Sequence, residues 1–139
     1  MSQTDTTDYF GFEVPFMHAL GLIPETIDTH FCRTRLPARP DLANSRGDVH
    51  GGTLMSVLDF TLSAAARGHA PATTGVATID LSTHFMDAAR GEVIIEATCL
   101  RRGRSIAYCE GRVLDAATAQ CLVVAHGAFK LLERRSPGG

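Results

Sequence analysis

Residues 50–66 limit the possible folds of this 139-residue chain more than any other segment. The segment resembles a helix that is apolar or small on every side, opened by Gly51 and Gly52 and interrupted by one carboxylate, Asp59. A helix without a polar face must be surrounded by protein, and burying a lone carboxylate is costly unless it finds partners. We therefore expect a central buried helix whose acid either has a chemical task or is satisfied by neighbouring hydroxyl or backbone groups.

Composition indicates one ordinary folded domain, with 45% hydrophobic and 20% charged residues and a net charge of −2. That charge gives no electrostatic reason to expect a nucleic acid or an anionic membrane as partner. No segment approaches the ~20 apolar residues that span a bilayer, and the polar, acidic first residues are unlike a secretory signal. We expect a cytoplasmic protein with a single domain over 1–139, its core at about 25–132 and flexible ends at 1–8 and 133–139.

The cysteines and histidines show no pairing pattern. The four cysteines are far apart, three of them in alternating apolar runs where free thiols act as small core residues. The six histidines are scattered, without the spacing of metal ligands. We expect no disulfide, no metal and no cofactor.

Apolar periodicity predicts an α+β fold. A short helix is expected at 14–20, a strand at 25–36, a loop at 37–48, and the central helix ends near 67–68. From 73 onward the period becomes two, which indicates four strands at 78–85, 92–100, 105–114 and 121–132. In the first of these we expect Thr78 and Asp80 on one face and Leu81 and Phe85 on the other. The four strands are expected to form an antiparallel meander, with 25–36 as a fifth strand, in a long curved sheet wrapped around the helix.

The helix itself suggests where chemistry could occur. Backbone N–H groups at its first turn lack intrahelical partners, and Gly51 and Gly52 would let a ligand oxygen approach them, as a developing oxyanion requires. The alternative is that the glycines only allow close packing against a strand. Asp59 lies ~12 Å along the axis from Gly51, so one carbonyl cannot reach both on the same helix. If they cooperate, a twofold axis must bring Asp59 of one subunit to Gly51 of another.

These residues also form the pattern of a known family. The chain resembles the hotdog-fold acyl-CoA thioesterases of the phenylacetate-pathway (PaaI-like) type over roughly residues 42–132. The resemblance implies a helix wrapped by an antiparallel sheet, homodimers that often pair into tetramers, and hydrolysis of the thioester of acyl-coenzyme A. It rests on three segments: Asn44-x5-His50-Gly51-Gly52-x6-Asp59, Thr78-x-Asp80-Leu81-Ser82-x-x-Phe85, and Arg102-Gly103-Arg104.

Carried over by position, the family's carboxylate falls on Asp59, as nucleophile or general base, and its oxyanion donor on the Gly51 N–H. Asn44 matches a loop amide that holds water or the carbonyl from the partner subunit, and Thr78 matches a hydroxyl that can orient the attacking water. Taken alone, Asn44 is an ordinary turn residue and Thr78 an ordinary strand residue. His50 either assists directly or makes structural hydrogen bonds at the helix start.

Contacts to coenzyme A are expected near Gly52 and at a hairpin that carries three arginines. Guanidinium groups bind phosphate in bidentate fashion, although such a cluster can also be a solvated turn. Arg67 and His69 rank below these candidates. Two other activities remain open: a non-catalytic acyl-CoA-binding protein, and a hydratase or dehydratase of acyl thioesters, whose usual histidine motifs are not found. The hairpin residues are Arg101, Arg102 and Arg104.

Overall fold

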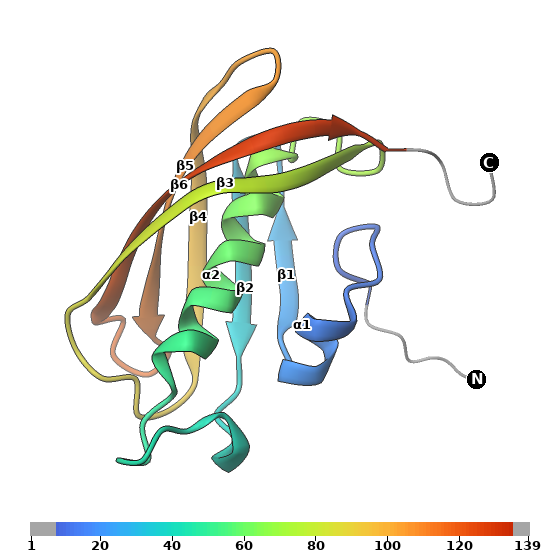
Figure 1. Cartoon of the computed structure of the whole chain (residues 1–139). Coiled ribbons are helices and arrows are strands. Elements are labelled where there is room, and N and C mark those ends of the chain that lie inside the picture. Colours follow the sequence, from blue (N-terminus) through green and yellow to red (C-terminus); the bar gives the residue numbers. More distant parts are fainter. Residues whose placement is uncertain (1–7, 135–139) are drawn as a thin grey trace, which may run out of the picture.

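The computed structural model describes residues 8–134, which form one six-stranded antiparallel sheet curved around a long helix (Figure 1). The strands follow the spatial order β1-β2-β4-β5-β6-β3, so β1 and β3 are the sheet edges. This arrangement confirms the expected α+β architecture with a sheet wrapped around a helix. The elements are α1 (Pro15–Leu20), β1 (Ile23–Ile27), β2 (Phe31–Leu36), a 3-10 turn (Pro40–Leu42), α2 (Gly51–Ala66), β3 (Thr74–Phe85), β4 (Val93–Arg102), β5 (Ile106–Asp115) and β6 (Cys121–Glu133).

Two details of the predicted topology were wrong. The single strand expected at 25–36 is a hairpin of β1 and β2, because Asp28 bends the chain by accepting the N–H of His30 at 3.1 Å. The expected four-strand meander comprises only β4, β5 and β6, since β3 pairs with β6 and β2 pairs with β4. The connection at 86–92 passes the ends of β6 and β5, where Met86 donates to Leu122 and Ala116 donates to Glu92. The crossover leaves β3 as a free edge.

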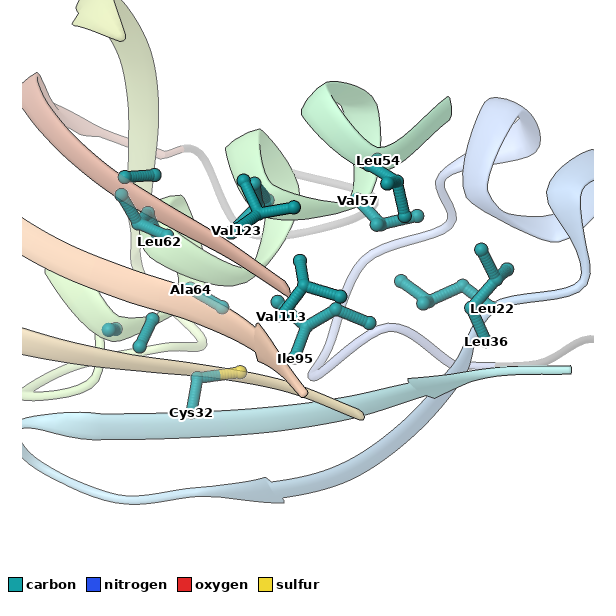
Figure 2. Close-up of a cluster of buried hydrophobic side chains, with 14 of the residues drawn as sticks. Leu22, Cys32, Leu36, Leu54, Val57, Leu62, Ala64, Ile95, Val113 and Val123 are labelled. Carbon is teal, nitrogen blue, oxygen red and sulfur yellow. The ribbon is translucent and has the colours of Figure 1, made fainter. Parts of the chain in front are cut away.

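The core lies between α2 and the concave face of the sheet (Figure 2). Leu54, Val57 and Leu62 of the helix meet Ile95 and Val113 of the strands, and all five side chains are at most 2% exposed. Apolar contact of this kind holds the helix in a fixed position and orientation on the sheet. Cys32, Cys99 and Cys109 are buried in this core as free thiols, and Cys121 is half-buried.

The chain from Tyr9 to Met17, here called the N-terminal strap, packs against the side of α2 that the sheet leaves free. The Tyr9 side chain is 1% exposed, and its hydroxyl donates to the Leu22 carbonyl at 2.9 Å. The core thus begins well before residue 25, which corrects the predicted boundary. The predicted flexible ends lie mostly outside the described residues.

The strap does not cover α2 completely, so the described residues of one chain do not surround the helix on every side. Met55, Ser56, Asp59 and Ser63 stay half-buried along one stripe of the helix surface, while Gly52 is exposed. Across residues 8–134, no helix combines the length and apolarity that crossing a bilayer would need.

Candidate active site

The first turn of α2 presents one backbone donor. His50 is the N-cap residue, and its Nδ1 accepts the N–H of Gly52 at 2.8 Å. Because that nitrogen accepts, the neutral imidazole carries its proton on Nε2. The cap occupies the Gly52 donor, whereas the Gly51 N–H has no hydrogen-bond partner among residues 8–134. His50 thus has a structural role at the helix start and leaves Gly51 as the available donor.

Packing does not require glycine at position 51. A Cβ built there would lie 3.5 Å from the Phe85 ring, an ordinary contact, whereas one on Gly52 would lie 3.1 Å from Nδ1 of His50. Gly51 instead lines an open hollow of about 270 Å³, here called the Gly51 hollow. Asn44 and Met86 also line it. The missing side chain therefore leaves the Gly51 N–H open to a ligand.

Asn44 lies beside that donor, and its two amide atoms have different tasks. The Oδ1 atom accepts the backbone N–H groups of Arg46 at 2.9 Å and Asp48 at 3.1 Å. These bonds hold the loop before α2 in a turn. The Nδ2 group has no partner in the described part of the chain, so Asn44 can offer a second N–H donor to a carbonyl oxygen in the Gly51 hollow.

The acid is two turns further along α2. Thr78 of β3 donates its hydroxyl to Oδ1 of Asp59 at 2.6 Å, as expected for a bond to a charged acceptor. The Oδ2 atom of Asp59 has no hydrogen-bond partner within residues 8–134. Both side chains line a second hollow of about 310 Å³, here called the Asp59 hollow. The carboxylate is thus fixed at one oxygen and free to react at the other.

A β-bulge places the Thr78 hydroxyl on the face that carries α2. The pairing of β3 with β6 shifts between Thr78 and Asp80, where Ile79 is the extra residue. Thr78 consequently lies opposite the buried Phe129, while Asp80 lies opposite Ala128 on the outer face. Regular alternation had placed Thr78 and Asp80 on the same face, and the bulge corrects that prediction.

The Gly51 hollow and the Asp59 hollow share no lining residue. Asp59 is eight residue steps along the helix from Gly51, a rise of ~12 Å. One chain therefore carries a donor half-site, with Gly51 and Asn44, and an acid half-site, with Asp59 and Thr78. A single carbonyl group cannot contact both.

Comparison with known proteins identifies the family. Residues 46–122 match the Thioesterase superfamily model, and the chain is 34% identical over 122 residues to a presumed esterase of Halobacterium salinarum, covering 81% of each protein. The chain belongs to the thioesterase superfamily. A presumed esterase of Mycobacterium tuberculosis has a similar structure, with 27% identity, 88% and 99% of the two chains covered and a TM-score of 0.80.

This family has the hotdog fold that the sequence suggested. The PaaI protein from the phenylacetic acid degradation operon of Escherichia coli superposes with a TM-score of 0.73 over 82% of this chain and 86% of its own. Its identity of 15% supports the shared fold alone. Family membership supports hydrolysis of an ester or thioester as the class of activity.

The arginines of this thioesterase-superfamily chain divide into two groups. Arg102 caps the end of α2, where its guanidinium donates to the carbonyls of Ala65, Ala66 and Thr29 at 2.6–3.1 Å. Those bonds occupy the side chain and favour a structural role. The exposed arginines at 101 and 104 of the same hairpin have no hydrogen-bond or ion-pair partner among the described residues, and they remain available to an anion.

Arg67, a lower-ranked candidate, is also structural. Its guanidinium donates to the carbonyls of Tyr9, Phe10 and Pro71 at 2.7–3.0 Å. Burial lowers the pKa of this side chain from its ordinary value, and burial together with the charge of Arg102 lowers the pKa of His69. Arg67 therefore ties the N-terminal strap to the end of α2.

Sequence reasoning missed the apolar walls of the Asp59 hollow. Several come from the strap, including Phe12, Val14 and Phe16. The density of aromatic residues between Tyr9 and Phe16 is the signal that could have found them, because aromatic side chains seldom gather in a flexible segment. The acid half-site is thus bordered by a segment about 45 residues before the acid in the sequence.

Proposed function

We propose that this protein is an acyl-CoA thioesterase whose active sites lie between two subunits, each combining the donor half-site of one chain with the acid half-site of the other. The observation that carries the proposal is the Asp59 carboxylate, which Thr78 holds at one oxygen and which has no partner at the other oxygen within residues 8–134. The unpartnered Gly51 N–H on the same helix supplies the complementary group.

In the general-base form of the reaction, Asp59 takes a proton from water, and the resulting hydroxide adds to the thioester carbonyl carbon. The carbonyl oxygen becomes an oxyanion, which receives hydrogen bonds from the Gly51 N–H and the Asn44 amide. When the C–S bond breaks, the coenzyme A thiolate takes the proton from Asp59. Thr78 keeps the carboxylate oriented throughout, and its oxygen can still accept a hydrogen bond from the water.

In the nucleophilic form, Asp59 attacks the carbonyl itself and forms an anhydride that water hydrolyses. Both forms need the same donors. Neither requires a metal or cofactor, because a thioester is electrophilic and a thiolate leaves readily. After a single turnover in ¹⁸O-labelled water, ¹⁸O in the Asp59 carboxylate would identify the nucleophilic form, in which water attacks the Asp59 carbonyl carbon of the anhydride.

Two surfaces support assembly through a second copy of the chain. The edge of β3 carries no paired strand within residues 8–134, and Ile79 on it is 54% exposed. A long edge with few charges is suited to pairing with another chain. The half-buried stripe of α2 that contains Asp59 is likewise left uncovered. A twofold axis that brings these surfaces together would join each donor half-site to an acid half-site.

The remaining parts of the proposal concern coenzyme A and the higher assembly. We place the phosphates of the substrate near Arg101 and Arg104, whose guanidinium groups have no partner in the described part of the chain. We expect the complete particle to be a pair of dimers. Arg102 is engaged at the end of α2 and contributes through the shape of the hairpin.

The test is a mixture of two inactive variants. Asp59→Asn preserves shape and should abolish most turnover of an acyl-CoA, and Gly51→Val should do the same by blocking the donor. Heterodimers isolated with two different affinity tags contain one site with both lesions and one with none, so they should regain about half of the wild-type activity. Wild-type turnover by Asp59→Asn would contradict the role of the acid. No recovery in verified heterodimers would contradict the shared site.

A further inference from the structure

Two buried thiols that the proposed reaction does not use lie directly opposite each other in the sheet. Cys99 of β4 is the register partner of Cys109 of β5, and both are free thiols. Their side chains are 6% and 1% exposed and belong to the hydrophobic core. Because residues directly opposite in an antiparallel pair project from the same face, the two sulfur atoms lie side by side.

The hydrogen bonds of β4 show which kind of pair this is. The N–H of Cys99 donates to the His30 carbonyl at 2.7 Å, on the β2 side of the strand. The backbone groups of Cys99 therefore point away from β5, and Cys99 and Cys109 form a non-hydrogen-bonded pair. In such a pair the Cα atoms are about 4.5 Å apart, within the range of about 4.4–6.8 Å that a disulfide spans.

A β-bulge beside the pair can accommodate the small movement that a covalent bond needs. The register of β4 with β5 shifts between Cys99 and Arg101, where Leu100 is the extra residue. The Cβ atoms of opposite residues are about 4.5–5.5 Å apart, whereas those of a disulfide are about 3.5–4.5 Å apart. Because a bulge bends and twists its strand locally, the two strands can approach here without shifting the rest of the sheet.

The two thiols differ in how readily they can react. Burial raises the pKa of Cys109 well above its ordinary value, and the neighbouring Cys99 raises it further through its charge and a hydrogen bond. Since the thiolate is the reactive form, Cys109 is a poor first nucleophile. Cys99 is the more exposed of the two, so an oxidant should reach it first and leave Cys109 to complete the bond.

We propose that Cys99 and Cys109 are a redox-sensitive pair that a peroxide converts into a disulfide joining β4 to β5. The Cys99 thiolate attacks one peroxide oxygen, the O–O bond breaks, and the leaving hydroxide takes up the proton that Cys99 lost, so that Cys99 becomes a sulfenic acid. The Cys109 sulfur then attacks the Cys99 sulfur, the S–O bond breaks, and the hydroxide leaves as water with the Cys109 proton. Two thiols are oxidised, and one hydrogen peroxide is reduced to two waters.

The disulfide would close the hairpin that caps the central helix. Arg102, in this hairpin, donates to the carbonyls of Ala65 and Ala66 at the end of α2. A cross-link removes conformational freedom from the unfolded chain, so the oxidised form should resist unfolding more strongly than the reduced form. The redox state of the pair would thus set how firmly the hairpin is held.

The experiment uses the full-length protein, freed of reductant, treated with hydrogen peroxide for minutes to hours, alkylated and digested with trypsin. Cleavage after Arg101 and Arg104 places Cys99 in peptide 91–101 and Cys109 in peptide 105–112. These peptides should be recovered joined to each other, and dithiothreitol should separate them. Cys99→Ala should abolish the joined product. Cys32→Ala is the matched control, because Cys32 is equally buried but faces Ala97 of β4, and it should retain the product.

Thermal unfolding without reductant gives a second measurement. Peroxide should raise the unfolding temperature of the wild type and Cys32→Ala by a few degrees, and it should not raise that of Cys99→Ala. Free thiols at 99 and 109 after the half-buried Cys121 has been oxidised, a link from Cys99 to Cys32, or a lower unfolding temperature of the linked form would each overturn the proposal. The wild-type digest decides the matter however well either variant folds.

Discussion

Thr78→Val tests the central contact of the acid half-site. The substitution keeps the side-chain shape but removes the hydroxyl that donates to Asp59 at 2.6 Å. A hydrogen bond to a charged group contributes about 1.5–3 kcal/mol, which corresponds to a loss of about 10- to 150-fold in kcat if the bond orients the carboxylate during reaction. Thr78 is exposed and valine is compatible with a strand, so the unfolding temperature should change little.

The assay is steady-state hydrolysis of an acyl-CoA, followed by the reaction of the released thiol with a chromogenic reagent. Thr78→Ser keeps a hydroxyl and should retain most of the wild-type kcat. In the double variant Asp59→Asn/Thr78→Val, kcat should be no lower than in Asp59→Asn alone. The Thr78–Asp59 hydrogen bond has no catalytic function once the carboxylate is absent. Wild-type kcat in Thr78→Val, or losses that add independently in the double variant, would refute the proposed role of this bond.

Four further substitutions test structural and functional roles. Arg102→Lys removes hydrogen bonds to the end of α2 and should lower the free energy of unfolding by about 1–3 kcal/mol. Arg104→Ala should leave the unfolding temperature unchanged. It should raise KM for acyl-CoA but not for a thioester that lacks the nucleotide. Gly51→Ala should keep or raise the free energy of unfolding by about 0.4–1 kcal/mol yet lower kcat/KM by about 10²-fold because the methyl group blocks the oxyanion donor. The hydrogen bond from Arg35, followed by its charge, lowers the pKa of Glu25 below 4.5, so Glu25 stabilises the fold above that pH and loses this effect as the pH falls through the lowered pKa. Glu25→Gln should therefore reduce the unfolding temperature by a few degrees at pH 7, and thermal unfolding across pH should show the difference disappearing in acid.

The central helix and most strands could be predicted because their signals are local. The apolar run after Gly51 and the period of two after Thr73 reflect burial on the helix and the sheet, and both appear in the structure at nearly the predicted bounds. The partner of each strand is not a local property. Pairing of β3 with β6 instead of β4 depends on the path of the connection at 86–92 around the sheet, which no periodicity records.

The candidate site shows the same division. Asp59 and Gly51 stand out because a lone acid and paired glycines are unusual in an apolar helix. Thr78 was identified through spacing, but regular alternation assigned it to the wrong face of the strand. The bulge at Ile79 changes the face, and no glycine or proline at that position marks the bulge in the sequence. The walls contributed by Phe12 and Phe16 depend on a long-range contact of the strap with α2, held by Arg67 from another segment. Such contacts become visible only when the chain is folded.

The distance between Gly51 and Asp59 on one helix has a consequence for inheritance. If each reaction centre draws on two chains, a copy that has lost its acid still supplies an intact helix tip to a normal copy. A mixed pair then retains one complete centre, and random pairing of equal numbers of damaged and sound copies would leave about half of all centres intact, the same as the fraction of sound copies. Damage to the acid would accordingly behave as a recessive trait.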